Sequence, residues 1–161
     1  MDEIRLIGLS EADIDLIINI KGFEGFKFLI FKSFEDSLTQ SISSEANYSF
    51  VIFESIESDY QAFWQQTRLQ CNAVQKLNFC YLFSYGQLDT AKNLYHNGKI
   101  NLYIQRPYSQ FLLVSSLLAL YYEKGPLSHV IEEVLELSLD DGCDAISEYM
   151  AQYRRKLLTN Y

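Results

Sequence analysis

The chain has few of the residues that interrupt or cross-link a fold. Two prolines and seven glycines among 161 residues argue against a disordered, collagen-like or linker-dominated protein. Its three cysteines, Cys71, Cys80 and Cys143, are odd in number and widely spaced, which fits neither a disulfide framework nor a zinc site. We interpret them as reduced thiols of a cytoplasmic protein.

Basic residues and long apolar runs are also scarce. Lysine and arginine number 13 against 21 acidic residues, and the net charge of -8 repels nucleic acid and anionic membrane surfaces. The longest apolar stretch, residues 111–122, is shorter than a bilayer span and contains two serines. The first residues carry no basic signal-peptide region. We therefore expect a cytoplasmic protein without a nucleic-acid or membrane partner.

Apolar residues, by contrast, make up 48% of the chain and follow a repeating order. Five short apolar runs, typical of buried strands, alternate with five segments whose apolar residues recur at helical spacing. This alternation predicts right-handed strand-helix-strand units and one parallel sheet with helices on both faces. The expected strands are residues 4–9, 26–31, 50–53, 79–83 and 100–104, and the expected helices are residues 10–21, 33–42, 59–76, 87–96 and 109–122.

Two of the expected helices carry local signals. Ser10 and Asp13, three residues apart, resemble a capping box at the start of the first helix. In the helix expected over residues 59–76, the apolar spacing turns Phe63, Leu69 and Val74 inward.

The composition changes after Gly125-Pro126, a pair that stops a helix. Residues 127–148 hold seven acidic and no basic residues, and their apolar residues recur at helical spacing. We therefore divide the chain into a first domain, residues 1–124, and an acidic helical C-terminal extension, residues 125–161.

Ligands bind at the carboxyl ends of the strands in an open parallel sheet, so the residues there are the candidates for a site. Glu54 follows the third predicted strand, Ser84 the fourth, and Arg106-Pro107 the fifth. In order and spacing they match the phosphoacceptor aspartate, the Ser/Thr and the Lys-Pro of response regulator receiver domains. Tyr103 stands at the family's switch aromatic, and Asn97-Gly98 matches the glycine before the fifth strand. Over residues 3–124 the chain thus resembles a receiver domain.

The resemblance implies a flavodoxin-like (CheY-like), doubly wound α/β fold with five parallel strands in the order 2-1-3-4-5. A working receiver holds Mg²⁺ with two acidic residues after the first strand, but here those positions are Leu9 and Ser10. Glu11 and Asp13 lie close by and would restore at most one metal ligand. Glu54 is also one methylene longer than the family's aspartate. We expect a degenerate pseudo-receiver whose Mg²⁺ site is lost, with no cofactor and no catalytic residue, and therefore not an enzyme.

Two interpretations of these substitutions stay open. Glu54 would place a permanent carboxylate near the phosphoryl position, where Arg106 grips it, Ser84 donates a hydrogen bond and Tyr103 reports a locked, active-like state. Alternatively, Glu54 and Arg106 are solvated strand-end residues whose pairing contributes little.

The resemblance implies a protein-protein interaction module in bacterial signal transduction that acts without phosphorylation. Its partner would be another signalling protein or a second copy, bound through the face of the fourth helix, fifth strand and fifth helix, where several tyrosines fall. One alternative is a phosphorylatable switch that accepts phosphate from a histidine kinase. A flavodoxin-type cofactor domain is a third, disfavoured because residues 9–12 form no glycine-rich phosphate loop.

Overall fold

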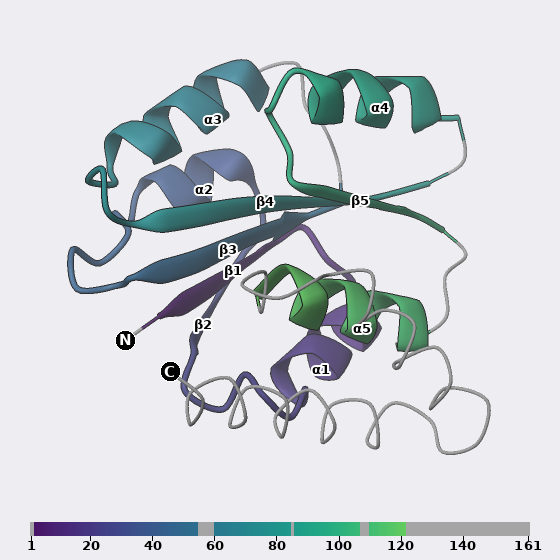
Figure 1. The fold of residues 1–161 in the computed structure, drawn as a ribbon, viewed down its shortest axis with the longest axis horizontal. Helices are drawn as coiled ribbons and strands as arrows, with labels where there is room; N and C mark the ends of the chain where they lie inside the picture. Colours follow the sequence, from purple (N-terminus) through teal and green to yellow (C-terminus); the bar gives the residue numbers. More distant parts are fainter. Residues whose placement is uncertain (1, 55–59, 85, 107–109, 122–161) are drawn as a thin grey trace, which may run out of the picture. The chain divides into compact units, whose positions relative to one another are not determined.

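The computed structural model describes residues 2–54, 60–84, 86–106 and 110–121 (Figure 1). The backbone divides into two compact units, Met1–Ile14 with Gly25–Pro107, and Asp15–Glu24 with Tyr108–Tyr161. All five strands belong to the first unit. The acidic C-terminal extension that we predicted, residues 125–161, lies outside the described residues.

The first unit is built on one parallel sheet. Its strands are β1 (Glu3–Ile7), β2 (Lys27–Phe31), β3 (Tyr48–Phe53), β4 (Lys76–Phe83) and β5 (Leu102–Gln105). They pair in the order β2-β1-β3-β4-β5, which confirms the predicted flavodoxin-like fold class. All five residues of β1, which lies between β2 and β3, are buried, as expected for a parallel strand covered on both faces. Because the strands are parallel, their carboxyl ends meet at one edge of the sheet.

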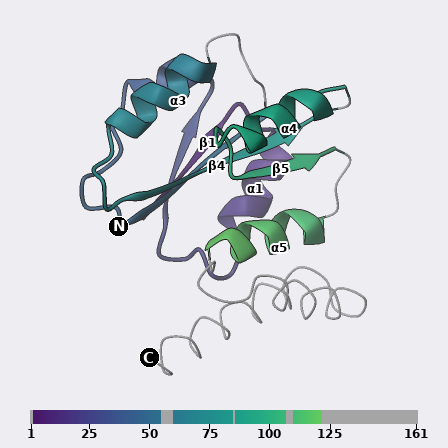
Figure 2. The same ribbon diagram turned by 45° about the horizontal axis from the view of Figure 1, so that its top comes forward.

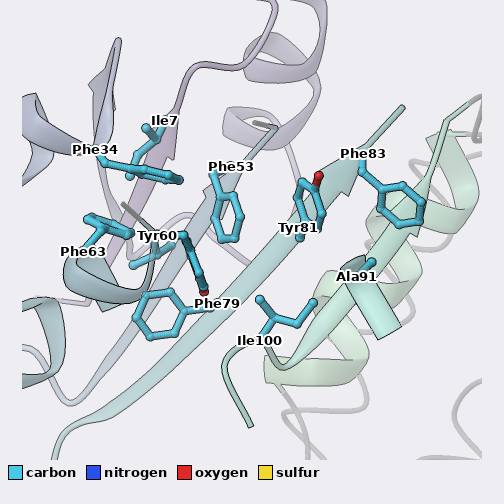
Figure 3. Close-up of a cluster of buried hydrophobic side chains, with 11 residues drawn as sticks. Ile7, Phe34, Phe53, Tyr60, Phe63, Phe79, Tyr81, Phe83, Ala91 and Ile100 are labelled. Atoms are coloured by element: carbon cyan, nitrogen blue, oxygen red, sulfur yellow. The ribbon is translucent and has the colours of Figure 1, made fainter. Parts of the chain in front are cut away.

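Three helices of this unit, α2 (Phe34–Leu38), α3 (Tyr60–Leu69) and α4 (Leu88–His96), lie on one face of the sheet (Figures 1 and 2). Between them and the sheet lies a core that is mainly aromatic (Figure 3). The Phe34 and Phe63 rings stack with centroids 4.3 Å apart, and Phe53 stacks on Tyr81 at 5.3 Å. Large rings bury much apolar area per residue, which suits a sheet covered by short helices.

A charged pair is buried on β1, within a stretch that we predicted as an apolar run. The Arg5 side chain is 1% exposed, and its Nε donates to Glu3 Oε2 at 2.9 Å. Arg5 Nη1 donates to the Ser37 carbonyl oxygen at 2.8 Å, and Glu3 Oε1 accepts from the Ser43 backbone N–H at 3.0 Å. The pair therefore joins α2 and the loop after it to β1, and each charge has a partner, as burial requires.

Three of the predicted helices end earlier than expected. The helix α3 ends at Leu69 rather than near residue 76, α2 ends at Leu38 rather than at residue 42, and the first helix, α1 (Glu11–Ile18), ends at Ile18 rather than at residue 21. Our expectation that Leu69 and Val74 turn inward was wrong, because their side chains are 84% and 82% exposed. After α3 the Asn72 side chain accepts from the backbone N–H groups of Val74 and Gln75, which turns the chain away from the helix axis.

The second unit contains the second half of α1 (Glu11–Ile18), whose first half belongs to the first unit, and all of α5 (Gln110–Tyr121). Phe23 and Tyr121 meet edge to face, with ring centroids 5.8 Å apart. In the described ranges, no helix combines the length and the apolar composition needed to cross a membrane.

Replacement of Phe63 by alanine should lower the free energy of unfolding by about 3–5 kcal/mol, because Phe63 is fully buried in the aromatic core. The matched control is Leu69→Ala on the same helix, which should change stability by less than about 0.5 kcal/mol because Leu69 is exposed. Urea unfolding followed by circular dichroism measures both. A loss of stability in Leu69→Ala as large as that in Phe63→Ala would contradict the described end of α3.

Candidate functional site at the carboxyl ends of the strands

Backbone pairing brings Arg106 and Glu54 to the carboxyl edge of the sheet. Glu54 directly follows β3, and Arg106 directly follows β5. The Arg106 backbone N–H donates to the Phe83 carbonyl oxygen at 2.8 Å, which places Arg106 beside the end of β4. The sheet therefore fixes the backbone positions of both residues.

At this edge the guanidinium of Arg106 contacts two carboxylates. Arg106 Nη2 donates to Asp13 Oδ2 at 2.5 Å, and Arg106 Nε lies 3.4 Å from Glu54 Oε1. The Asp13 side chain is 10% exposed, while those of Arg106 and Glu54 are 27% and 28% exposed. One positive charge is thus shared by two negative ones in partial burial, where removing one partner of an ion pair costs more than at a free surface.

Hydrogen bonds with Ser10 hold Asp13 in place at the start of α1. Ser10 Oγ donates to Asp13 Oδ2 at 3.0 Å, and the Asp13 backbone N–H donates to Ser10 Oγ at 3.3 Å. The predicted capping arrangement is therefore present, and it places the Asp13 carboxylate in the first turn of α1. Sequence reasoning had noted Asp13 for its capping role and missed it as the partner of Arg106.

The other residues predicted after β1 do not join this cluster. Leu9 is half-buried, and Ser10 is exposed and caps α1. Glu11, the metal-ligand candidate, is exposed. The acidic group that reaches Arg106 from this segment is Asp13, which stands three residues beyond the second position of the family's acidic pair. The capping motif was the one sequence signal that could have located the Asp13 carboxylate in the first turn of α1.

Ser84 directly follows β4 at the same edge, whereas Tyr103 lies within β5, three residues before Arg106. Ser84 is exposed, and the hydrogen bond that we expected it to donate to Glu54 is not formed among the described residues. The Tyr103 ring is half-buried and packs edge to face against Tyr95 of α4, with centroids 5.5 Å apart, and near Phe83 at 6.1 Å. Of the residues predicted around Glu54, Arg106 is thus the one that contacts it. Tyr103 instead links β5 to α4 through its contact with Tyr95.

The donor set at this edge does not suit Mg²⁺. The two carboxylates here already bind the Arg106 guanidinium, and position 9 offers an apolar side chain. Across the described part of the chain, no three or more His, Cys, Asp or Glu side chains gather closely enough to hold a metal ion.

The two described cysteines are not activated as nucleophiles. Burial raises the pKa of the Cys80 thiol, and burial is also the main cause that raises the pKa of the Cys71 thiol.

Comparison with known proteins gives structural relatives only. No family model matches the chain, and no curated protein matches it in sequence. Its fold is similar to that of an adenylate cyclase from Rhodopirellula baltica, with a TM-score of 0.56 and 15% identity over 86% of this chain and 98% of that one. A pilus assembly protein CpaE from Caulobacter crescentus gives a TM-score of 0.52 with 12% identity, covering 74% of this chain and 98% of that one.

A two-component response regulator from Clostridium difficile is also similar, with a TM-score of 0.51 and 19% identity over 78% of this chain and all of that one (100%). Together with the strand order, these likenesses establish a CheY-like receiver fold. At such identities they speak for the fold alone.

Replacement of Asp13 by asparagine should lower the free energy of unfolding by about 1–3 kcal/mol, between the values typical of exposed and of buried ion pairs. The change removes the carboxylate charge from the Arg106 guanidinium and keeps the shape of the side chain. Asp15→Asn, at an exposed position on the same helix, is the control and should be neutral. Equal stabilities of the two variants in urea unfolding would show that the Asp13–Arg106 pair contributes nothing.

Proposed function

We propose that this chain is a pseudo-receiver that acts in bacterial signal transduction as a protein-protein interaction module, independently of phosphorylation. One observation carries the proposal: Arg106 binds Asp13 and Glu54 together at the edge of the sheet where a receiver accepts phosphate. A guanidinium between two carboxylates occupies the place of a divalent cation and supplies one of its two positive charges.

Phosphoryl transfer is disfavoured at this site for electrostatic reasons. The reaction needs a cation that neutralises the oxygens of the transferring group, and carboxylates hold that cation in a receiver. Here Mg²⁺ would have to displace Arg106 from Asp13, and Leu9 would offer no replacement ligand. The site therefore loses the main source of transition-state stabilisation for this chemistry.

The contacts of Arg106 also bear on whether Glu54 locks an active-like state. Its contact with Glu54 agrees with the locked interpretation, but its shorter bond goes to Asp13, and Ser84 donates nothing to Glu54. We infer that Asp13, Arg106 and Glu54 together hold the edge in one state. Glu54 contributes to this state through its contact with Arg106.

The surface formed by α4 and β5 is the proposed contact for a partner or a second copy. Strand β5 is an edge strand of the sheet, and the α4 residue Tyr95 is 48% exposed while its ring contacts Tyr103. Exposed aromatic rings of this kind are enriched at protein interfaces. The held state at Arg106 would then present Tyr95 and Tyr103 in one fixed arrangement.

Titration with Mg²⁺ and then beryllofluoride, a phosphoryl mimic, tests the proposal. We expect no specific shift of the amide resonances of Glu54, Ser84, Tyr103 and Arg106, because Arg106 already binds the carboxylates. A phosphorylatable receiver domain titrated in parallel shows that the assay detects binding. Shifts at those four amides, or acid-labile phosphate on the chain after incubation with acetyl phosphate and Mg²⁺, would establish the phosphorylatable switch instead.

Replacement of Glu54 by alanine tests the held state. Loss of the carboxylate should let Arg106 move toward Asp13 and shift the ring resonances of Tyr103, measured by NMR with labelled tyrosine. Glu45→Ala, at an exposed position elsewhere in the unit, is the control and should leave Tyr103 unchanged. An unaltered Tyr103 in Glu54→Ala would mean that Glu54 has no part in the state, and would leave the edge as an inert scaffold.

A further inference from the structure

The surface of α3 and of the loop after it differs in charge from the chain as a whole. Residues 60–88 contain no aspartate or glutamate, although the chain holds 21 acidic residues and a net charge of -8. The charged residues within this stretch are Arg68 and Lys76. A locally basic surface on an acidic protein selects its ligands by charge, because the rest of the molecule repels the acidic ligands that this surface attracts.

Two cations on this surface lie against one aromatic ring. Lys99 Nζ is 3.7 Å from the centroid of Trp64, and Arg68 Cζ is 5.0 Å from it. The Tyr60 hydroxyl donates to the Lys99 carbonyl oxygen at 2.5 Å, which holds the Lys99 backbone close to α3. Among the described residues, no carboxylate forms an ion pair with Arg68 or Lys99. Both charges are therefore positioned and available to an acidic ligand.

Two large apolar side chains that follow Arg68 closely in the sequence are exposed. Leu69 follows Arg68 at the end of α3 and is 84% exposed, and Val74 in the next loop is 82% exposed. The loop is anchored, because Gln75 Nε2 donates to the carbonyl oxygens of Ser43 at 2.8 Å and Ala46 at 2.6 Å. The fold thus exposes to water two large apolar side chains that lie five residues apart in the chain, and exposed apolar groups that gather on a surface mark interaction sites.

We propose that this α3 surface, defined as Trp64, Arg68, Leu69, Val74 and Lys99, binds an acidic amphipathic segment of a partner protein. Apolar residues of the segment would cover Leu69 and Val74, and its carboxylates would pair with Arg68 and Lys99. Charge complementarity selects this partner over a lipid surface, since a membrane would also meet the acidic remainder of the molecule.

The inference deepens the proposed function, because it rests on the chain being a protein-binding module and states what kind of partner it takes. It needs no contribution from the Arg106 cluster. Val74 lies two residues before β4 begins, at the amino ends of the strands, whereas Arg106 lies at their carboxyl ends. The two sites can therefore be tested separately.

Trp64 is the chain's single tryptophan, so its fluorescence reports on this surface directly. The probe is a synthetic amphipathic helix of leucine and glutamate, and its control carries lysine in place of every glutamate. We expect saturable emission changes with the glutamate peptide.

Arg68→Glu and Leu69→Ser should each weaken binding of this peptide about tenfold, as removal of a central interface contact does. Their matched controls, Lys92→Glu and Ile30→Ser at exposed positions of α4 and β2, should change it by less than about twofold.

Three results would overturn the inference: no binding of the glutamate peptide, equal binding of the lysine peptide, or equal weakening by the control variants. Vesicles of phosphatidylserine and phosphatidylcholine, titrated in the same way, would overturn it in favour of a lipid surface if they alone changed the emission. Glu54→Ala should bind the glutamate peptide as the unaltered chain does. Failure at the α3 surface would therefore leave the Mg²⁺ and beryllofluoride result as the separate test of the pseudo-receiver proposal.

Discussion

The bond between the Arg106 guanidinium and the Asp13 carboxylate, with Glu54 close on the other side, determines what the carboxyl edge of the sheet can do. A planar guanidinium binds two carboxylates at once and keeps its charge at every physiological pH. Both carboxylates of this edge thereby have a cationic partner within the chain itself. The proposed loss of phosphoryl transfer follows from that arrangement, because a divalent cation would have to compete with Arg106 for them.

The aromatic core supplies the rigid frame for this edge. Phe53 and Phe83, the last residues of β3 and β4, are fully buried, and each lies one residue before a polar side chain of the edge. Their packing fixes the strand ends, and the backbone bond from Arg106 to Phe83 carries that fixed position to the guanidinium. At the amino ends of the strands the same frame displays Leu69 and Val74. The first unit thus carries the Arg106 cluster at the carboxyl ends of its strands and the α3 surface toward their amino ends.

The strands were predictable because five apolar runs alternate with helical patterns, and their parallel order follows from short right-handed connections. The places of Glu54 and Arg106 after β3 and β5 were predictable for the same reason. Helix ends were less so: apolar spacing continued through Leu69 to Val74, while the hydrogen bonds of Asn72 turned the chain. The role of Asp13 and the buried Arg5 were missed, since Asp13 pairs with Arg106 and Arg5 bonds to Ser37, partners far away in the sequence.

The most direct measurement of the central claim is the side-chain NMR spectrum of Arg106, with its Nε–H and Nη–H resonances assigned by comparison with Arg106→Lys. A guanidinium bound to Asp13 and Glu54 rotates slowly about its Nε–Cζ bond, so we expect separate Nη resonances that stay unchanged when Mg²⁺ is added. The same resonances should merge in Asp13→Asn. Averaged Nη resonances in the unaltered chain, or their displacement by Mg²⁺, would contradict the account.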